Sequence, residues 1–432
     1  MRDSSDKLIL PAKARDMFLG IVIGDALGTT VDGLGNGHIH AHFRTIDDYI
    51  DPAPALKGNM AKWKKPGLYS SISQFAFLLA LCPPRRAFID SFRRYVAESP
   101  AVGNSESGIF RYPDGAERRF IASVRDQRPS HQTSSPPCSR VLPAAVPISF
   151  RTGRLAERIS DTISYASLFT RDVQTVAAAV SFVCLAGSLP GSPEGAVDFI
   201  RESIEVNGMI LGSIAENPGA IFELRLNPDH LAEEISLQNA ILEKISRADT
   251  LKEAEDVICR MINPRLKTPV TRATVNLPAA ILPFAISLSS LHQNDPGALF
   301  AAVSEGGSTA VLSSMAGALL AGRFGAERLP EVLIRDLVNR RRVLALTDAL
   351  EEGSIPPGRR DEFLNAEASL TSKELDELAA KVKHARNKPK KESRTRGDQE
   401  KQLTRHVVES WTKLDRARWK KERRGTNKKD EF

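Results

Sequence analysis

The clearest indication of the fold comes from the segment Met17-Phe18-Leu19-Gly20-Ile21-Val22-Ile23-Gly24-Asp25-Ala26-Leu27-Gly28. It is apolar on almost every side of a helical wheel, which predicts a helix buried at the centre of an all-helical protein. Gly20, Gly24 and Gly28 lower the stability of such a helix, so we expect another segment to approach its backbone closely. Asp25 lies among these apolar residues, and a carboxylate there must be hydrogen-bonded or paired with a cation.

Helical patterns dominate the rest of the chain, because few segments alternate apolar and polar residues for long enough to form a strand. Further apolar helices are predicted over residues 70–81, 175–186, 276–291 and 308–321, and amphipathic helices are predicted across residues 193–262. The predicted fold class is therefore all-α.

Two other segments have a different character. Residues 101–137 are rich in Ser, Pro, Gly and charge with little apolar period, so we expect a long surface excursion. Thr371-Ser372-Lys373-Glu374 is typical of a capping box. It predicts a helix that begins there and carries Leu375, Leu378 and Val382 on one face.

The basic character of the chain lies in its C-terminal tail. Residues 386–432 contain 17 Lys/Arg and 8 Asp/Glu, whereas the remaining residues contain 43 and 45. A near-neutral body argues against a folded domain that holds nucleic acid across its whole surface. We therefore divide the chain into a helical domain at 1–350, a linker and helix at 351–385, and a basic tail at 386–432.

Leu403, Val407, Trp411 and Leu414 form a narrow apolar stripe within this tail. The pattern predicts a tail that is partly disordered or forms a marginal solvated helix. The alternative is a helix that docks on an anionic partner, a nucleic acid or an anionic surface.

Composition is typical of a cytoplasmic globular protein. No apolar run reaches the roughly 18–20 residues that a bilayer-spanning helix needs. The first residues, MRDSSDKLILPAKARD, include acids and lack the apolar stretch of an export signal, so we do not expect export. Cys82, Cys138, Cys184 and Cys259 lie far apart without a CxxC spacing, and we expect reduced core thiols.

Several segments, in the right order, make the chain similar to the ADP-ribosylglycohydrolases, the family of ADP-ribosyl-acceptor and dinitrogenase-reductase-activating hydrolases. Residues 18–28 resemble the opening helix of that family. Residues 67–74 resemble the segment that carries its Thr-Asp-Asp-Thr-Gln motif, and residues 306–319 resemble Gly-Gly-Asp-Thr-Asp-Thr and the Ala/Gly-rich helix that follows. Residues 139–143 resemble its Met-Arg-Val-x-Pro segment, and residues 167–172 resemble its Ser-x-x-Thr-His stretch.

The resemblance spans residues 16–349 and implies an orthogonal multi-helix bundle of the ADP-ribosylglycohydrolase type with a central cleft. In active members of the family, two Mg²⁺ or Mn²⁺ ions lie between two Asp-bearing helix starts and orient the ribose. An acid near the first helix assists hydrolysis of the N- or O-glycosidic bond to ADP-ribose.

This sequence departs from the family where the metal-binding aspartates are expected. The first pair of aspartates corresponds to Ser71 and Ile72, and the second pair corresponds to Ser308 and Ala310. Magnesium prefers anionic oxygen ligands, so neutral hydroxyls and apolar side chains are not expected to hold two divalent ions. We therefore expect no metal cofactor and a loss of metal-dependent hydrolysis.

The resemblance also assigns roles to other residues. Asp32 corresponds to the catalytic acid of the family, but its side chain is one methylene shorter. Arg171 stands in place of the usual histidine, where it could contact a phosphate or lie on the surface. Asp25 is expected to brace the cleft rather than react. The predicted ligand-binding cleft comprises Asp25, Ser70, Ser71, Ser73, Arg140, Arg171, Gly306, Gly307, Ser308 and Thr309.

The leading hypothesis is a metal-site-degenerate member that binds ADP-ribose-type ligands or ADP-ribosylated protein without efficient hydrolysis. Helix N-termini and hydroxyls would then accept a diphosphate, although the Ser/Gly-rich helix starts can also serve tight packing alone. A second hypothesis is an active hydrolase that uses Asp32 with an unusual or absent metal site. A third is a scaffold that acts through its basic tail.

His38, His40 and His42 lie close together after the first helix. On a strand they would share one face and could bind Zn²⁺ or Ni²⁺. Asp47 and Asp48 follow, but no carboxylate or cysteine at a typical spacing completes a ligand set. We favour a solvated loop, with a metal site as the alternative.

Overall fold

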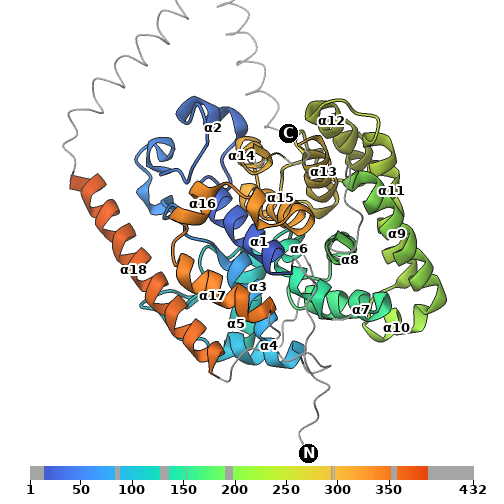
Figure 1. The fold of residues 1–432 in the computed structure, drawn as a ribbon, viewed down its shortest axis with the longest axis horizontal. Helices are drawn as coiled ribbons and strands as arrows, with labels where there is room; N and C mark the ends of the chain where they lie inside the picture. The colour runs from blue at the N-terminus through green and yellow to red at the C-terminus, as the bar shows by residue number, and fades with distance from the viewer. Residues whose placement is uncertain are drawn as a thin grey trace, which may run out of the picture. The chain divides into compact units, whose positions relative to one another are not determined.

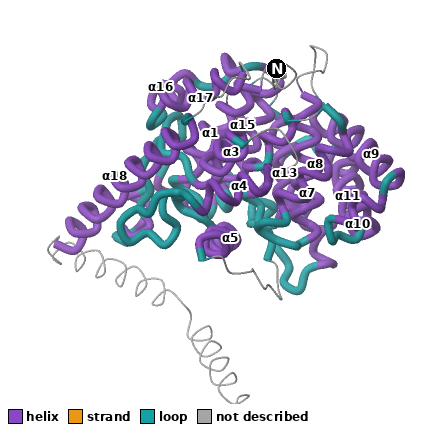
Figure 2. Tube along the Cα trace, turned by 90° about the horizontal axis from the view of Figure 1, so that it is seen from below, coloured by secondary structure: helices purple, strands orange, loops and turns teal. Residues whose placement is uncertain are grey.

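The computed structural model describes residues 14–82, 88–126, 136–151, 153–189, 198–292, 295, 297–351 and 358–387. Within these ranges the regular structure is helical, apart from an isolated β-bridge between Gly35 and Gly306 (Figure 2). The all-α prediction is confirmed. None of the helices described is both long enough and apolar enough to cross a membrane.

The helices follow one another with short connections. The α-helices are α1 (Ala14–Thr29), α2 (Asn36–His42), α3 (Ser71–Leu81), α4 (Phe88–Ala97), α5 (Gly115–Arg125), α6 (Val141–Ala144), α7 (Leu155–Ala166), α8 (Val173–Ser188), α9 (Phe199–Glu216), α10 (Pro218–Glu223), α11 (Pro228–Ile245), α12 (Leu251–Ile262), α13 (Pro278–Leu291), α14 (Gly297–Ser304), α15 (Thr309–Phe324), α16 (Glu331–Asp336), α17 (Arg340–Glu351) and α18 (Arg359–Asn387). The 3₁₀ helices are η1 (Ala53–Leu56), η2 (Met60–Lys62), η3 (Val146–Phe150), η5 (Asn263–Arg265) and η6 (Ala326–Arg328).

Helices α1 and α15 form the central pair of the fold and lie side by side (Figure 1). A Cβ atom added at Gly20 would lie 2.1 Å from the carbonyl oxygen of Gly317, and one at Gly24 would lie 2.1 Å from that of Ser313. Side-chain carbons do not approach other atoms so closely, so the two backbones meet because these positions are glycine. The predicted close approach to the first helix is confirmed, and α15 is its partner.

The apolar helices α3, α8 and α13 are buried along most of their length. Polar side chains define where two of them begin. The hydroxyl of Ser70 accepts the backbone N–H of Ile72 at 3.2 Å to cap α3, and the carboxylate of Asp172 accepts that of Thr175 at 2.8 Å to cap α8. The amphipathic helices α9, α11 and α12 pack against α8 and α13, as their apolar faces predict.

Residues 101–137 do not form the expected surface excursion over their described part. They include α5, where Asp114 and Glu117 form a capping box. Phe120 is 3% exposed and Val124 is 9% exposed, so this helix contributes to the core. The expectation was wrong because charged residues between the apolar positions obscured the helical period.

The helix predicted to begin at Thr371 begins earlier, at Arg359 of α18. Thr371 and Glu374 are buried in the middle of this helix and cap nothing. The hydroxyl of Thr371 instead donates to the carbonyl oxygen of Ile109 at 2.8 Å. The Ser/Thr-x-x-Glu pattern predicted the wrong helix start. These side chains lie inside the helix, where tertiary contacts that the pattern does not reveal satisfy their hydrogen bonds.

The chain divides into two compact units, Met1–Leu378 and Ala379–Phe432. The described part of the second unit is the last portion of α18, up to Asn387. The predicted apolar stripe from Leu403 to Leu414 lies outside the described residues.

The four cysteines are buried free thiols. Burial raises the pKa of Cys82 and of Cys184 to about 12. Because the thiolate is the reactive form, these two groups are inert near neutral pH.

Candidate functional site

Asp25 of α1 caps the start of α3 from across the core. Its Oδ2 accepts the backbone N–H of Ser70 at 2.8 Å and of Ser73 at 3.1 Å, and both serine hydroxyls donate to the carboxylate at 2.6 Å. The hydroxyl of Thr29 donates to it at 2.9 Å. These bonds satisfy a fully buried carboxylate, and its negative charge stabilises the N-terminal end of α3. Asp25 therefore connects α1 to the start of α3.

The guanidinium group of Arg140 lies against the same helix start. Its Nη2 donates to Ser70 Oγ at 2.6 Å and to Ser71 Oγ at 3.0 Å, while its Nε donates to Glu117 Oε2 at 2.9 Å. Only 6% of the side chain is exposed. Burial disfavours its charge, but Glu117 and Asp32 outweigh burial and raise the pKa of Arg140. Arg140 is therefore a buried permanent cation.

Glu117, at the start of α5, is the carboxylate that holds Arg140. Its Oε2 also accepts the hydroxyl of Ser71 and the backbone N–H of Asp114, both at 2.8 Å. Burial raises the pKa of Glu117 to about 7, although the charge of Arg140 opposes the shift. The charge of this carboxyl therefore changes near neutral pH.

Asp32 lies at the partly exposed end of the network, with 24% of its side chain accessible. Its Oδ1 accepts the backbone N–H of Ala310, in the first turn of α15, at 3.3 Å. Its Oδ2 faces Lys64 Nζ at 3.9 Å and Arg140 Nη1 at 3.7 Å. Burial lowers the pKa of Lys64, although Asp32 opposes the shift. Two cations and the start of α15 thus surround one carboxylate.

The glycine loop before α15 is joined to the end of α1. Gly306 and Gly307 have φ angles of 72° and 75°, a left-handed conformation that favours glycine. The N–H of Gly307 donates to the carbonyl oxygen of Leu34 at 2.7 Å. The hydroxyl of Thr309 donates to the carbonyl oxygen of Gly28 at 2.7 Å. These bonds place the start of α15 beside the end of α1.

The structure brings together most of the residues that the sequence singled out. Hydrogen bonds or ion pairs connect Asp25, Asp32, Ser70, Ser71, Ser73 and Arg140. Gly306, Gly307 and Thr309 shape the adjoining backbone, and Ser308 precedes α15 without a hydrogen bond from its side chain to the helix. Arg171 is exposed and takes no part in these bonds among the residues described.

Glu117 and Lys64 belong to the site but were not predicted from the sequence. A signal for Glu117 was present, because Asp114 three residues before it completes a capping box. Lys64 had no such signal, since Lys62 and Lys65 lie beside it and look alike in the sequence. Tertiary structure alone decides which lysine faces Asp32.

The sequence resemblance predicts that four residues stand at the aspartate positions of the family, and their side chains are neutral: Ser71, Ile72, Ser308 and Ala310. The hydroxyl of Ser71 is engaged by Glu117 and Arg140. Ile72 is fully buried, and Ala310 contributes only its backbone N–H. Among the His, Cys, Asp and Glu residues within the described ranges, no group of three is arranged to hold a metal ion.

The histidines after α1 lie on α2, so the expected solvated loop is replaced by a short helix. The rings of His38 and His42 are 4.7 Å apart, and His38 Nε2 lies 2.7 Å from the carbonyl oxygen of Ala55. His40 is exposed. Because residues four apart share a helical face and residues two apart do not, the three imidazoles do not converge as they would on a strand.

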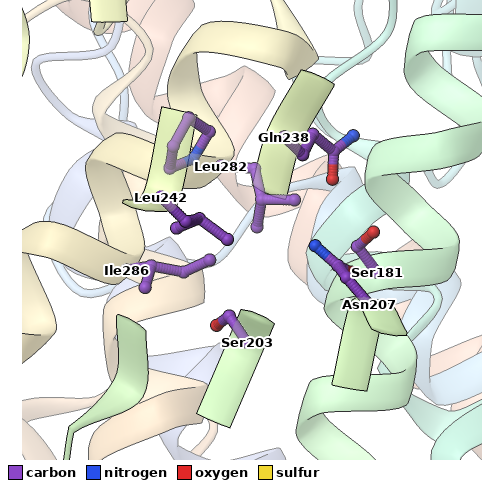
Figure 3. Close-up of a pocket in the computed structure, with 8 residues that line it drawn as sticks. Ser181, Ser203, Asn207, Gln238, Leu242, Leu282 and Ile286 are labelled. Carbon is purple, nitrogen blue, oxygen red and sulfur yellow. The ribbon is translucent and has the colours of Figure 1, made fainter. Parts of the chain in front are cut away.

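A small cavity lies among α8, α9, α11 and α13, apart from this network (Figure 3). Its volume is about 10 Å³, which is room for a single water molecule. Ser181 Oγ and Gln238 Oε1 line the cavity and have no hydrogen-bond partner among the residues that the structure describes. The cavity fits an internal water and is too small for an organic ligand.

The match to a protein-family model agrees with the sequence resemblance. Residues 6–360 match the family model described as ADP-ribosylglycohydrolase. A solved structure described as "ADP-ribosylglycohydrolase-related protein complex" is 16% identical, with 81% of this chain and 99% of that chain covered and a TM-score of 0.47. None of the curated proteins matches the chain.

Proposed function

The chain belongs to the ADP-ribosylglycohydrolase family, and we propose that it binds ADP-ribose-type ligands or ADP-ribosylated protein without efficient hydrolysis. Members of this family bind ADP-ribosylated substrates and are normally metal-dependent. The observation that carries the proposal is the position of Arg140. Its buried guanidinium is bonded to Ser70 and Ser71, at the helix start where the family resemblance would place metal ligands.

The donors at the two helix starts do not fit a pair of divalent cations. Magnesium takes a near-octahedral set of oxygen ligands and prefers anionic ones. Ser71 and Ser308 offer neutral hydroxyls, and the side chains of Ile72 and Ala310 offer no ligand atom.

The buried carboxylates of Asp25 and Glu117 already accept hydrogen bonds from other groups. Asp25 accepts hydrogen bonds from the backbone and hydroxyls at the start of α3. Glu117 accepts hydrogen bonds from Arg140 and Ser71. Binding of a metal ion by either carboxylate would leave these buried donors unsatisfied, which is costly.

Two features support the binding of an anionic ligand such as a diphosphate. The N-terminal end of α15 adjoins Asp32, and helix N-termini favour negative charge. The side chain of Lys64 is 18% exposed, and Arg140 Nη1 lies 3.7 Å from Asp32 Oδ2. The ammonium group of Lys64 can form a charge-assisted hydrogen bond with a phosphate oxygen.

Isothermal titration calorimetry with ADP-ribose, in the presence and absence of Mg²⁺, tests the proposal. We expect binding that does not depend on Mg²⁺, and no release of ADP-ribose from modified arginine or serine. Lys64→Met should weaken binding by about tenfold, because a charge-assisted hydrogen bond is lost while the partly exposed site still folds. Arg201→Met is the matched control, because Arg201 is 74% exposed on α9.

Binding that requires Mg²⁺, together with release of ADP-ribose from a modified side chain, would contradict the proposal. Anomalous scattering from manganese between the starts of α3 and α15 would contradict it as well. Unchanged affinity of the Lys64→Met variant would remove this lysine from the ligand site.

A hydrolase that uses Asp32 without the metals of the family is the second candidate. It is favoured by the partial exposure of Asp32 beside two cations, where a carboxylate can act as general base toward water. On this hypothesis Asp32→Asn abolishes turnover of an ADP-ribosylated peptide. A variant that keeps the wild-type rate excludes it.

A further inference from the structure

We infer that α18 holds the candidate ligand site in its binding geometry, with Glu367 as the positioning residue. The candidate ligand site comprises Asp32, Lys64, Ser70, Ser71 and Arg140. Residues matched to the family model end at 360, whereas α18 spans Arg359–Asn387. Nearly all of this helix is therefore an addition to the family-matched part of the chain. The inference rests on the proposed function for the identity of the ligand. Its structural part, that α18 fixes the start of α3, does not depend on that function.

Glu367 is the central contact between α18 and the start of α3. Its side chain is 0% exposed, and its Oε2 pairs with Arg111 Nη2 at 2.6 Å. The hydroxyl of Tyr69 donates to Oε1 at 2.6 Å, and the amide of Gln74 donates to Oε2 at 2.8 Å. Tyr69 precedes the cap residue Ser70, and Gln74 lies in the first turn of α3.

Arg111 extends this contact to the backbone of the site. Its Nε donates to the carbonyl oxygen of Tyr69 at 2.9 Å, and its backbone N–H donates to Gln74 Oε1 at 2.8 Å. The N–H of Ser71 in turn donates to the carbonyl oxygen of Arg111 at 2.8 Å. Ser71 is one of the two serines that bind Arg140. Arg111 therefore connects Glu367 to the candidate ligand site through hydrogen bonds.

A second contact reaches the lysine side of the site. Glu377 of α18 forms an ion pair with Lys65. Lys65 directly follows Lys64, whose ammonium group faces Asp32. The same helix therefore positions both the serines and the lysine of the candidate site.

A buried ion pair is a weak source of stability, because desolvation offsets much of the attraction. It does impose one geometry, since each donor around Glu367 is satisfied only when α3 and α18 keep their register. This distinguishes a positioning role from general stabilisation. A positioning role predicts a local change at the start of α3 when Glu367 loses its charge.

Hydrogen–deuterium exchange of the full-length Glu367→Gln variant tests the inference without any ligand. We expect amides in residues 66–75 to exchange about tenfold faster, while amides of α1 and α15 stay within about twofold of wild type. Glu362→Gln is the matched control, because Glu362 lies on the same helix with 52% of its side chain exposed. It should leave both regions unchanged.

Faster exchange to the same degree in α1, α15 and residues 66–75 would overturn the inference, because it indicates general destabilisation. Unchanged exchange in residues 66–75 would overturn it too. If Glu367→Gln does not fold, the variant Glu377→Gln decides, since this side chain is 43% exposed and forms an ion pair with Lys65. This variant should speed amide exchange around Lys65, and an unchanged rate there would refute the positioning role of α18.

Titration with ADP-ribose adds the functional arm. The Glu367→Gln variant should bind about tenfold more weakly than wild type, while the control variant binds as wild type. Wild-type affinity in a variant with loosened residues 66–75 would show that α18 does not position the ligand site. Absence of ADP-ribose binding in the wild-type protein would refute the proposed function. The exchange measurement would then be the test of whether α18 positions the start of α3.

Discussion

The contact between α1 and α15 and the contact between α3 and α18 both hold the candidate site, but by different physical means. At the first, the backbone of Gly24 lies against that of Ser313, and a Cβ atom there would lie 2.1 Å from a carbonyl oxygen. At the second, the carboxylate of Glu367 is buried against Arg111 at 2.6 Å. The first contact depends on shape and the second on charge.

This difference predicts opposite responses to substitution. A close-packed backbone contact has no room for an added atom, and it cannot be repaired by a change elsewhere. A buried ion pair fails when one partner is removed, but apolar groups can replace the pair when both partners change together.

Gly24→Ala should have the largest effect, a loss of about 4 kcal/mol or more in the free energy of unfolding, because two helix backbones must separate. Urea denaturation measures it. Gly37→Ala is the control, since a Cβ atom at Gly37 meets nothing within 4 Å. A Gly24→Ala variant as stable as the control would show that α1 and α15 can shift without cost.

Arg111→Met should cost about 3 kcal/mol, because it leaves the charge of Glu367 buried without a cation. The double variant Arg111→Met/Glu367→Leu should recover part of this loss in the same urea experiment. A double variant less stable than the single one would mean that the hydrogen bonds from Tyr69 and Gln74 to Glu367 dominate this contact.

The charged site should also respond to pH, whereas the glycine contact should not. Burial raises the pKa of Glu117 from 4.5 to about 7, so in this range the folded protein binds more protons than the unfolded chain. The free energy of unfolding should therefore fall as pH rises from 4.5 to about 7 because of Glu117.

Glu117→Gln removes this titration. Its unfolding free energy relative to wild type should increase over this range by an amount on the order of 2 kcal/mol. Urea denaturation at several pH values measures the difference, from which the similar contribution of Glu374 cancels. A difference that does not vary with pH would contradict the raised pKa.

Ser313→Ala should have the smallest effect, about 1 kcal/mol. It removes the hydrogen bonds from the Ser313 hydroxyl to the carbonyl oxygens of Gly24 at 2.6 Å and Thr309 at 2.5 Å, and it adds no atom to the contact. A loss as large as that of Gly24→Ala would mean that hydrogen bonding, rather than shape, holds α1 against α15.

Much of the fold could be predicted because buried helices show a recognisable pattern of apolar residues in the local sequence. The apolar period of residues 17–28 predicts α1, and its glycines predict a close neighbour. The identity of that neighbour depends on contacts between segments almost 300 residues apart, such as Thr309 with Gly28, for which no local pattern exists. The buried half of α18 was missed for the same reason, since its buried polar face pairs with residues of α3 and the segment before α5.

The candidate site was predictable in part. The order of motifs pointed to Ser70, Ser71 and Arg140, and the structure connects them directly. Glu117 and Lys64 were missed because their roles follow from the partners they face. An ionisable side chain on its own specifies neither its partner nor its pKa.

The amino-acid sequence alone indicates which helices are apolar throughout, and its resemblance to the family predicts serine, isoleucine and alanine at the aspartate positions. These are properties of residue type and periodicity, which act over a few neighbouring residues. Folding alone brings Arg140 against Ser70 and Ser71 and brings α18 to the start of α3. Such contacts arise from the packing of distant segments, because electrostatic and hydrogen-bond energies depend on distances that the order of residues does not specify.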